Sequence, residues 1–276
     1  MDGSKERTPV VVGVDGSPDS QRAVEWAMRL ARREERPVTL LHAGDGRRGR
    51  EPVDRAEEIA HALAPDVVVR RREVTDGPRQ ALLSASRSAS VVVLGARGTG
   101  PLSHLRLGSV AHAVTRRAAC PVVVTRTAGA DRRPGVVAGF DLQPSSRDVL
   151  DFAFRVAEAR SWPVTLLHCF WDSTGETGDL DTAASTGLPE RHRLCAAAAE
   201  CATAHPGVEV RTLLSRGFAD RRLLAATLDS ALVVVGHREL PWLEALVYGH
   251  VTPVVVEHAV GDVAVVPLTS GGEASR

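Results

Sequence analysis

The sequence predicts an α/β protein built from two tandem five-stranded sheets, each open, mostly parallel and covered by helices on both faces. The first observation is an internal repeat, because Val10–Asp15 resembles Val136–Asp141, and Pro37–His42 resembles Pro163–His168, each 126 positions later. The second is that short runs rich in valine alternate with amphipathic helical patterns along both copies. Strands that alternate with helices are typical of a parallel sheet packed between two helical layers.

The elements of the first copy follow from these patterns in order. Val10–Val14 is a β-branched apolar run, as expected of a buried strand. Ser17 and Pro18 suit the N-cap and first position of the helix that follows. The later expected elements are a strand over Val38–Leu41, a helix around Val53–Leu63, a strand near Val67–Val69, a helix near Pro78–Ser86, a strand over Val91–Leu94, a helix from Ser109 to about Arg117 and a strand over Pro121–Thr125.

The second copy carries one insertion. Val91–Gly95 matches Leu232–Gly236 at a spacing of 141, and the additional residues fall mostly in Asp172–Glu190, which is rich in Ser, Thr, Gly and Asp and is predicted to be a loop. The expected organisation is a flexible tail over 1–7, a first domain over 8–127, a linker over 128–134, a second domain over 135–268 and a flexible tail over 269–276.

The composition excludes several classes of protein. The 276 residues carry a formal net charge of zero, which argues against general binding to nucleic acid or to a membrane surface. No apolar run reaches the roughly 18–20 residues of a membrane span, and the first residues lack the apolar region of a secretory signal. The four cysteines form no CxxC pair, so we expect reduced, structural thiols and a cytoplasmic protein.

The sequence shows no catalytic apparatus. The single lysine, Lys5, lies near the N-terminus, so neither a P-loop nor a Schiff-base lysine is present in the body of the chain. No Ser/His/Asp or Cys/His arrangement and no acid/base pair of carboxylates can be argued from spacing. We therefore expect a binding protein with no catalytic residues.

A loop rich in glycine follows the fourth strand of the first copy. Gly95-Ala96-Arg97-Gly98 is followed by nine residues and then by Gly108-Ser109. Glycine allows the backbone to approach a phosphate closely, and the free N–H groups at the start of the next helix favour an anion. Ser109 could cap that helix and also bind a phosphate oxygen. The loop leaves the carboxyl end of a strand, where open α/β sheets bind ligands.

Asp15 ends the first strand at the same edge of the sheet. It could bind a ribose hydroxyl or help to hold Mg²⁺. In the alternative interpretation, Asp15 and Ser17 only shape the turn and cap the helix. The sequence leaves both interpretations open.

These residues carry a resemblance to a known family. VVVGVDGS at Val10–Ser17, the strand Val38–Leu41 and GARG-x9-GS followed by Val110 closely resemble the universal stress protein family, in a Rossmann-like fold that binds adenine nucleotides. The complete loop marks the ATP-binding subclass, so the resemblance implies ATP in the first domain. The residues that it implies as contacts are Gly13, Asp15 and Ser17 near the ribose and phosphates, Ala43 near the adenine, and Leu94, Gly95, Arg97, Gly98, Thr99, Gly108, Ser109 and Val110 around the ribose and phosphates.

Our hypothesis is a cytoplasmic, ATP-binding regulatory protein of the stress response, in which ATP orders the loop Gly95–Ser109 and shifts a surface that an unknown protein partner recognises. Two alternatives stay open: a slow ATPase of the same fold, and an interaction module whose nucleotide is only structural.

The second copy departs from the loop pattern. Glu239 stands where the first copy has Gly98, His250 stands in place of Ser109, and Gln143 stands in place of Ser17. A carboxylate close to a phosphate is repulsive by about 1 kcal/mol or more. We expect ATP in the first domain only.

Two other features are assigned to the fold. His42 and His168 recur at equivalent strand ends in both copies, including the one with the altered loop, which favours a structural role. Arg70-Arg71-Arg72 follows a predicted strand and is expected to be a solvated face, while His104 and Arg106 are expected to be exposed loop residues, with a contact to the γ-phosphate as the alternative.

Each copy ends in an apolar strand, Pro121–Thr125 and Val263–Pro267. As a sheet edge, each would leave a hydrophobic row of unpaired backbone groups. Tandem linkage raises the effective concentration of one edge near the other, and domains of the resembling family pair through this strand. We expect an antiparallel pairing of the two, an intrachain pseudo-dimer; assembly of two chains into a homodimer stays open.

A charge in the middle of the first of these strands tests that pairing. Val123→Asp should lower the free energy of unfolding and cause aggregation, because it breaks the interface and exposes both edges. Chemical denaturation and size-exclusion chromatography measure both effects. A variant with the stability and solubility of the wild type would contradict the pairing.

Overall fold

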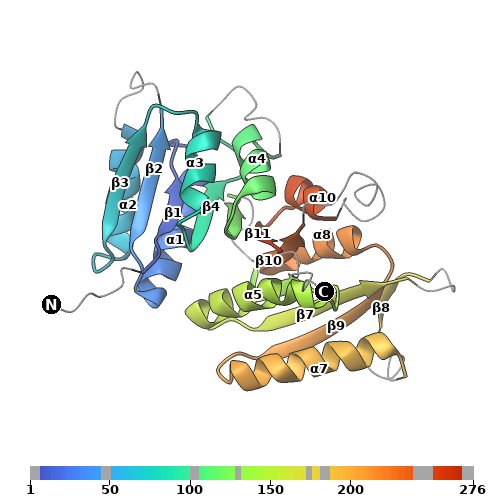
Figure 1. Ribbon diagram of the computed structural model, residues 1–276. Helices are drawn as coiled ribbons and strands as arrows, with labels where there is room; N and C mark the ends of the chain where they lie inside the picture. The colour runs from blue at the N-terminus through green and yellow to red at the C-terminus, as the bar shows by residue number, and fades with distance from the viewer. Residues whose placement is uncertain are drawn as a thin grey trace, which may run out of the picture. The chain divides into compact units, whose positions relative to one another are not determined.

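The computed structural model describes residues 7–44, 51–99, 106–127, 132–171, 176–180, 187–238 and 251–268. The chain divides into two compact units, Met1–Thr127 and Ala128–Arg276. Each unit is an α/β domain with a central, mostly parallel sheet (Figure 1). Within the described residues, no helix combines the length and the hydrophobicity that a membrane crossing requires.

The sheet of the first unit has the strand order β3-β2-β1-β4-β5, and its pairs are parallel. Its strands are β1 (Val10–Gly13), β2 (Val38–Ala43), β3 (Val69–Val74), β4 (Val91–Gly95) and β5 (Val122–Thr125). Val12 of β1 pairs with Leu40 on one side and Val93 on the other, and all three are fully buried. The valine-rich runs are therefore interior strands, as parallel sheets covered on both faces require.

Four helices cover this sheet. They are α1 (Pro18–Glu34), α2 (Glu51–Leu63), α3 (Pro78–Ser86) and α4 (Ser109–Arg117). Helix α1 packs on α2 and α3 packs on α4, which makes two helical layers. Ser17 is the N-cap of α1, as predicted, and its side chain accepts a hydrogen bond from the backbone N–H of Ser20 at 3.1 Å.

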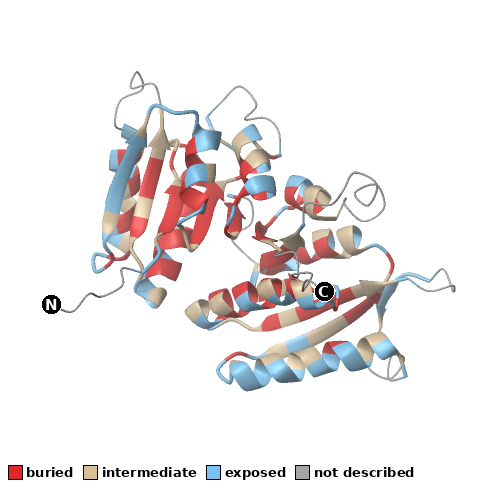
Figure 2. Ribbon diagram, viewed as in Figure 1, coloured by how far each residue is buried: buried red, intermediate tan, exposed pale blue. Residues whose placement is uncertain are grey.

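The second unit has the strand order β11-β10-β6-β7-β9-β8. Its strands are β6 (Arg133–Gly139), β7 (Val164–Phe170), β8 (Gly178–Leu180), β9 (Val210–Arg216), β10 (Ser230–His237) and β11 (Asp262–Pro267). Its helices are the short 3₁₀ turn η1 (Pro144–Ser146), α5 (Arg147–Arg160), α7 (Pro189–Ala204), α8 (Ala219–Asp229) and α10 (Val251–His258). Figure 2 shows that buried residues concentrate on the inner strands, whereas β3 and α7 are largely exposed.

The prediction of two five-stranded sheets is wrong for the second unit, where six strands are described. The sixth, β8, lies inside the predicted loop insertion and pairs antiparallel with β9. Asp179 of β8 accepts hydrogen bonds from Nε and a terminal nitrogen of Arg222 in α8, at 2.6 and 2.7 Å. A strand of three residues is too short to show an alternating hydrophobic pattern in the sequence. It is recognised in the structure by its pairing with β9 and by the ion pair between Asp179 and Arg222. In addition, β6 begins at Arg133, inside the predicted linker.

Strand β3 lies further along the chain than predicted. It was expected near Val67–Val69 but covers Val69–Val74, so Arg70, Arg71 and Arg72 lie within the strand. All three arginines are exposed, and Arg71 forms ion pairs with Asp54 and Glu57 of α2. The charge run concealed the strand because an exposed edge strand need not follow the apolar pattern.

Candidate functional site

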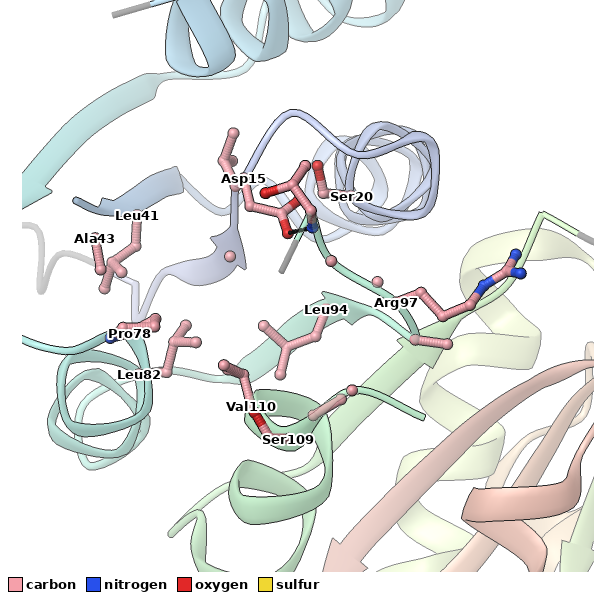
Figure 3. A pocket seen from close by; sticks show the side chains of 18 residues that line it. Asp15, Ser20, Leu41, Ala43, Pro78, Leu82, Leu94, Arg97, Ser109 and Val110 are labelled. Atoms are coloured by element: carbon pink, nitrogen blue, oxygen red, sulfur yellow. Dashed lines mark hydrogen bonds between the residues drawn. The ribbon is translucent and has the colours of Figure 1, made fainter. Parts of the chain in front are cut away.

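A cavity of about 330 Å³ opens at the carboxyl ends of β1, β2 and β4 in the first unit (Figure 3). Helices α3 and α4 border it, and the glycine-rich loop after β4 forms one wall. The residues that line it are Gly13, Val14, Asp15, Ser20, Leu41, Ala43, Pro78, Leu82, Leu94, Gly95, Ala96, Arg97, Gly98, Thr99, Gly108, Ser109, Val110 and Ala111.

Every residue that the resemblance implied as a contact lines this cavity except Ser17. Several other residues that line the cavity, most of them apolar, were not predicted from the sequence: Val14, Ser20, Leu41, Pro78, Leu82, Ala96 and Ala111. The helical pattern marks a residue such as Leu82 as buried, and Leu82 is 3% exposed. Whether a buried residue faces the core or a cavity depends on how the helix packs, which a periodic pattern does not contain.

Two loop glycines are required by close packing inside the protein. A Cβ on Gly95 would lie 2.7 Å from the carbonyl carbon of Asp19 and 2.8 Å from the nitrogen of Ser20. A Cβ on Gly98 would lie 2.4 Å from Oδ2 of Asp15. The loop therefore lies directly against the start of α1, and only residues without a side chain permit this approach.

Asp15, just after β1, holds the loop through a hydrogen bond. Its Oδ1 accepts a hydrogen bond from the N–H of Ser17 at 3.0 Å, and its Oδ2 accepts one from the N–H of Thr99 at 3.1 Å. This is the turn-shaping role that the sequence left open, and Asp15 also lines the cavity. Across the described residues, no group of three or more His, Cys, Asp or Glu side chains could hold a metal ion.

Ser17 positions the loop from behind the cavity. Besides capping α1, its hydroxyl donates a hydrogen bond to the backbone oxygen of Arg97 at 3.0 Å, and the residue is 5% exposed. Ser17 therefore holds α1 and the loop together and does not line the cavity, and its position near the ribose and phosphates stays a prediction.

Arg97 is held by a buried carboxylate. Asp19 is 2% exposed, and its Oδ2 accepts hydrogen bonds from the backbone N–H and from Nε of Arg97, each at 3.1 Å. Its Oδ1 accepts from the N–H of Thr127 at 3.1 Å and from the hydroxyl of Thr127. Arg97 lines the cavity, but its guanidinium points away from it (Figure 3), and a contact with the phosphates stays a prediction.

The charge of Asp19 is stabilised by these partners. Burial by itself raises the pKa of Asp19, but the hydrogen bonds from Arg97 and Thr127 and the positive charge of Arg97 outweigh burial, so the pKa lies below its usual value. Asp19 is therefore ionised at neutral pH.

Helix α4 begins at the cavity. Its N-cap is Gly108 (φ −74°, ψ 155°), and no side chain caps it, so the prediction that Ser109 caps this helix is wrong. Ser109 is the first helical residue instead, because the extended backbone of Gly108 already makes the turn into the helix. The N–H groups of the first helical turn have no partner within a helix, and Ser109, Val110 and Ala111 all line the cavity. The positive end of the helix is thus directed to the cavity.

The recurring histidines have equivalent bonds in the two units. Nδ1 of His42 is 2.7 Å from the backbone oxygen of Val14, and Nδ1 of His168 is 2.8 Å from that of Phe140. These bonds join adjacent strands, which agrees with the structural role expected. His104, Glu239 and His250 lie outside the described residues.

Fold and cavity together define a protein of two α/β domains with a glycine-lined cavity at the carboxyl edge of the first sheet. The model of the Universal stress protein family matches residues 6–53, 45–126 and 135–267, and the chain belongs to this family.

Mycobacterial relatives match over nearly their whole length. The chain is 29% identical over 290 residues to a universal stress protein of Mycolicibacterium smegmatis, which covers 93% of this chain and 96% of the relative. It is 27% identical over 277 residues to the universal stress protein Rv2623 of Mycobacterium tuberculosis, covering 91% and 93% of the two chains.

Solved structures show the same fold. A universal stress protein from Archaeoglobus fulgidus DSM 4304 matches with a TM-score of 0.64 at 17% identity, covering 94% of this chain and 98% of that one. A structure from Pseudomonas aeruginosa UCBPP-PA14 matches with a TM-score of 0.68 at 16% identity, covering 95% and 93%.

Removal of the buried charge tests the role of Asp19. We expect Asp19→Asn to lower the free energy of unfolding by about 1–3 kcal/mol at pH 7, because bonds from a charged acceptor are lost. The folded pKa is lowered, so this stabilisation is complete above the unfolded pKa of about 3.9 and is lost as the pH falls through the folded pKa. The gap between wild type and variant, measured by urea unfolding, should narrow from pH 7 to pH 3.

The exposed Asp76 in the same unit provides the control. Asp76→Asn should leave the free energy of unfolding within about 0.5 kcal/mol of the wild type. A gap for Asp19→Asn that is the same at both pH values would contradict the ionised state of the carboxylate.

Proposed function

We propose that the first unit binds ATP and that the protein is a nucleotide-dependent regulator of the stress response. The observation that carries this proposal is the convergence of the glycine-rich loop and the first turn of α4 on one cavity, opposite an apolar wall. Backbone N–H groups at a helix start, next to glycines, favour a phosphate group. The volume of about 330 Å³ is at the small end of the range of ligand pockets.

The two sides of the cavity suit the two ends of a nucleotide. Leu41, Ala43, Pro78 and Leu82 provide an apolar surface for a planar base. The first turn of α4 provides backbone donors for the phosphates, and Gly98 lines the cavity beside it. In this proposal Mg²⁺ arrives with ATP and is held mainly by phosphate oxygens and water, with Asp15 as the nearby carboxylate.

The chemistry of the lining residues favours binding over catalysis. Among the described residues that line the cavity there is no His, Cys or Lys, and both oxygens of Asp15 accept backbone hydrogen bonds. General acid–base catalysis needs a group that is free to take or give a proton. We therefore propose a binding protein whose occupied state is recognised by a protein partner. Phosphate release from purified protein incubated with ATP would favour the slow ATPase instead.

The stoichiometry of binding tests the difference between the units. We expect one ATP per chain, because the sequence places Glu239 and His250 in the second unit where the first has Gly98 and Ser109. Isothermal titration calorimetry measures the number of sites. Two equivalent sites per chain would contradict this asymmetry.

Substitution of one glycine tests the loop. Gly98→Glu should weaken ATP binding by about a hundredfold or more, because like charges about 4 Å apart repel by about 4 kcal/mol near a protein surface. The side chain would also displace Asp15, since a Cβ at Gly98 would lie 2.4 Å from Oδ2 of Asp15. Calorimetry on the folded variant gives the affinity.

Gly207 provides a matched control, because no heavy atom lies within 4 Å of the Cβ that would be added there. Gly207→Glu should bind ATP like the wild type. Near-normal affinity in a folded Gly98→Glu protein would refute the assignment of the loop.

A further inference from the structure

The second unit contains a cavity of its own. It has a volume of about 310 Å³ and lies at the carboxyl ends of β6, β7 and β10, the edge that corresponds to the cavity of the first unit. Much of its wall is apolar and consists of Phe140, Leu167, Leu223, Val235 and Leu268. The two units therefore contain cavities of similar size at equivalent edges of their sheets.

The carboxylate that holds the loop in the first unit is replaced in the second. Ser145 stands 126 positions after Asp19, and its hydroxyl accepts a hydrogen bond from Arg238, which corresponds to Arg97. Leu268 stands 141 positions after Thr127. Its side chain lies against Gly236, where an added Cβ would be 2.9 Å from Cδ1 of Leu268. Leu268 thus borders the second cavity with an apolar side chain. In the first unit its counterpart, Thr127, bonds to Asp19 instead.

A buried histidine offers an acceptor in this cavity. His168 lines it and is 8% exposed. Its Nδ1 bonds to a carbonyl oxygen, which can only accept, so Nδ1 carries the hydrogen and Nε2 of the neutral ring is an acceptor. Burial lowers the pKa of His168, which keeps the ring neutral at neutral pH.

Among the described residues of the first unit, no histidine lines the cavity. His42 makes the same Nδ1 bond to a carbonyl but is not among the lining residues there. Both cavities border the start of a helix, α4 in the first and α10 in the second, and among the described residues a histidine ring lines only the second.

Aromatic rings lie at the same edge of the second sheet. Trp171 and Phe218 are 55% and 51% exposed, and their rings meet edge to face with centroids 4.9 Å apart. Phe218 immediately precedes Ala219, and Trp171 follows Cys169 by two residues; both Ala219 and Cys169 line the cavity. Large exposed aromatic side chains beside a cavity favour a planar apolar ligand.

We propose that the cavity of the second unit binds a small, planar, uncharged heteroaromatic molecule that donates an N–H hydrogen bond to Nε2 of His168. The sequence places Glu239 at the position of Gly98, and a carboxylate there would repel a phosphate group. This site is separate from the nucleotide proposed for the first unit.

The test uses the full chain, labelled with ¹⁵N, and follows backbone amide shifts. The probes are indole and benzimidazole, their N-methyl twins, and adenosine monophosphate. Indole and benzimidazole should shift the amides of Ala219 and Thr252, which line the cavity, and each N-methyl twin should bind about fivefold more weakly. No shift at these residues with either N–H probe overturns the proposal. Equal binding of the twins overturns the bond to His168, and equal binding of adenosine monophosphate at these residues overturns the ligand class.

One variant separates the acceptor from the structural bond. In His168→Asn the amide nitrogen can still donate to the oxygen of Phe140, but Nε2 is gone. Binding of the N–H probes should fall about fivefold, to the level of the N-methyl twins. His42→Asn is the matched control and should change no probe affinity at the second cavity. An unchanged affinity in folded His168→Asn would overturn the assignment of the acceptor.

A second variant fills the cavity without touching His168. Ala219 lines the cavity at the start of α8, and Ala225 is exposed on the same helix. Ala219→Phe should abolish the shifts at Thr252, whereas Ala225→Phe should leave them unchanged. Shifts that persist in Ala219→Phe would place the probes elsewhere and overturn the proposal.

Discussion

The cavity of the first unit depends on how closely the chain after β4 approaches the first turn of α1. Gly95 has no room for a Cβ at that contact. Three side chains at or just before the start of α1 then bond to the loop: Asp15 to the N–H of Thr99, Ser17 to the oxygen of Arg97, and Asp19 to Arg97. These bonds hold the loop at the cavity wall and leave the start of α4 directed inward. Asp15 and Ser17, which the sequence marks as candidate ligand contacts, thus also hold the loop in place through hydrogen bonds.

The second unit has the same basic arrangement of sheet and helices, but the hydrogen bonds at the corresponding positions differ. Asp141, the counterpart of Asp15, accepts hydrogen bonds from Gln143 and Ser146 of its own segment. Arg238 bonds to a neutral hydroxyl where Arg97 bonds to a carboxylate. A duplicated domain that no longer needs its loop bonds can exchange them for apolar contacts, because the sheet and helices are stabilised by their own core. The two cavities can therefore differ in ligand while the fold is shared.

Much of the fold could be predicted from local patterns. Helices α3 and α4 have the predicted bounds, and α1 has the predicted cap, because proline at a helix start and an apolar stripe act over a few residues. Strand β3 was placed too early because its exposed arginines break the apolar pattern. Strand β8 was missed because its three residues are defined by pairing with β9 and by the bond from Arg222 to Asp179.

The sequence by itself determined the duplication, the α/β class and the glycine-rich loop, since repeats, periodicity and glycine spacing depend only on the order of the residues. Only the tertiary structure decided the direction of individual side chains at the cavity. The charge of Arg97 is turned away by a carboxylate 78 positions earlier, and His168 lines a cavity while His42 does not. The physical reason is that a local pattern records burial and backbone conformation, whereas hydrogen-bond partners and cavity walls come from segments that meet only when the sheet is assembled.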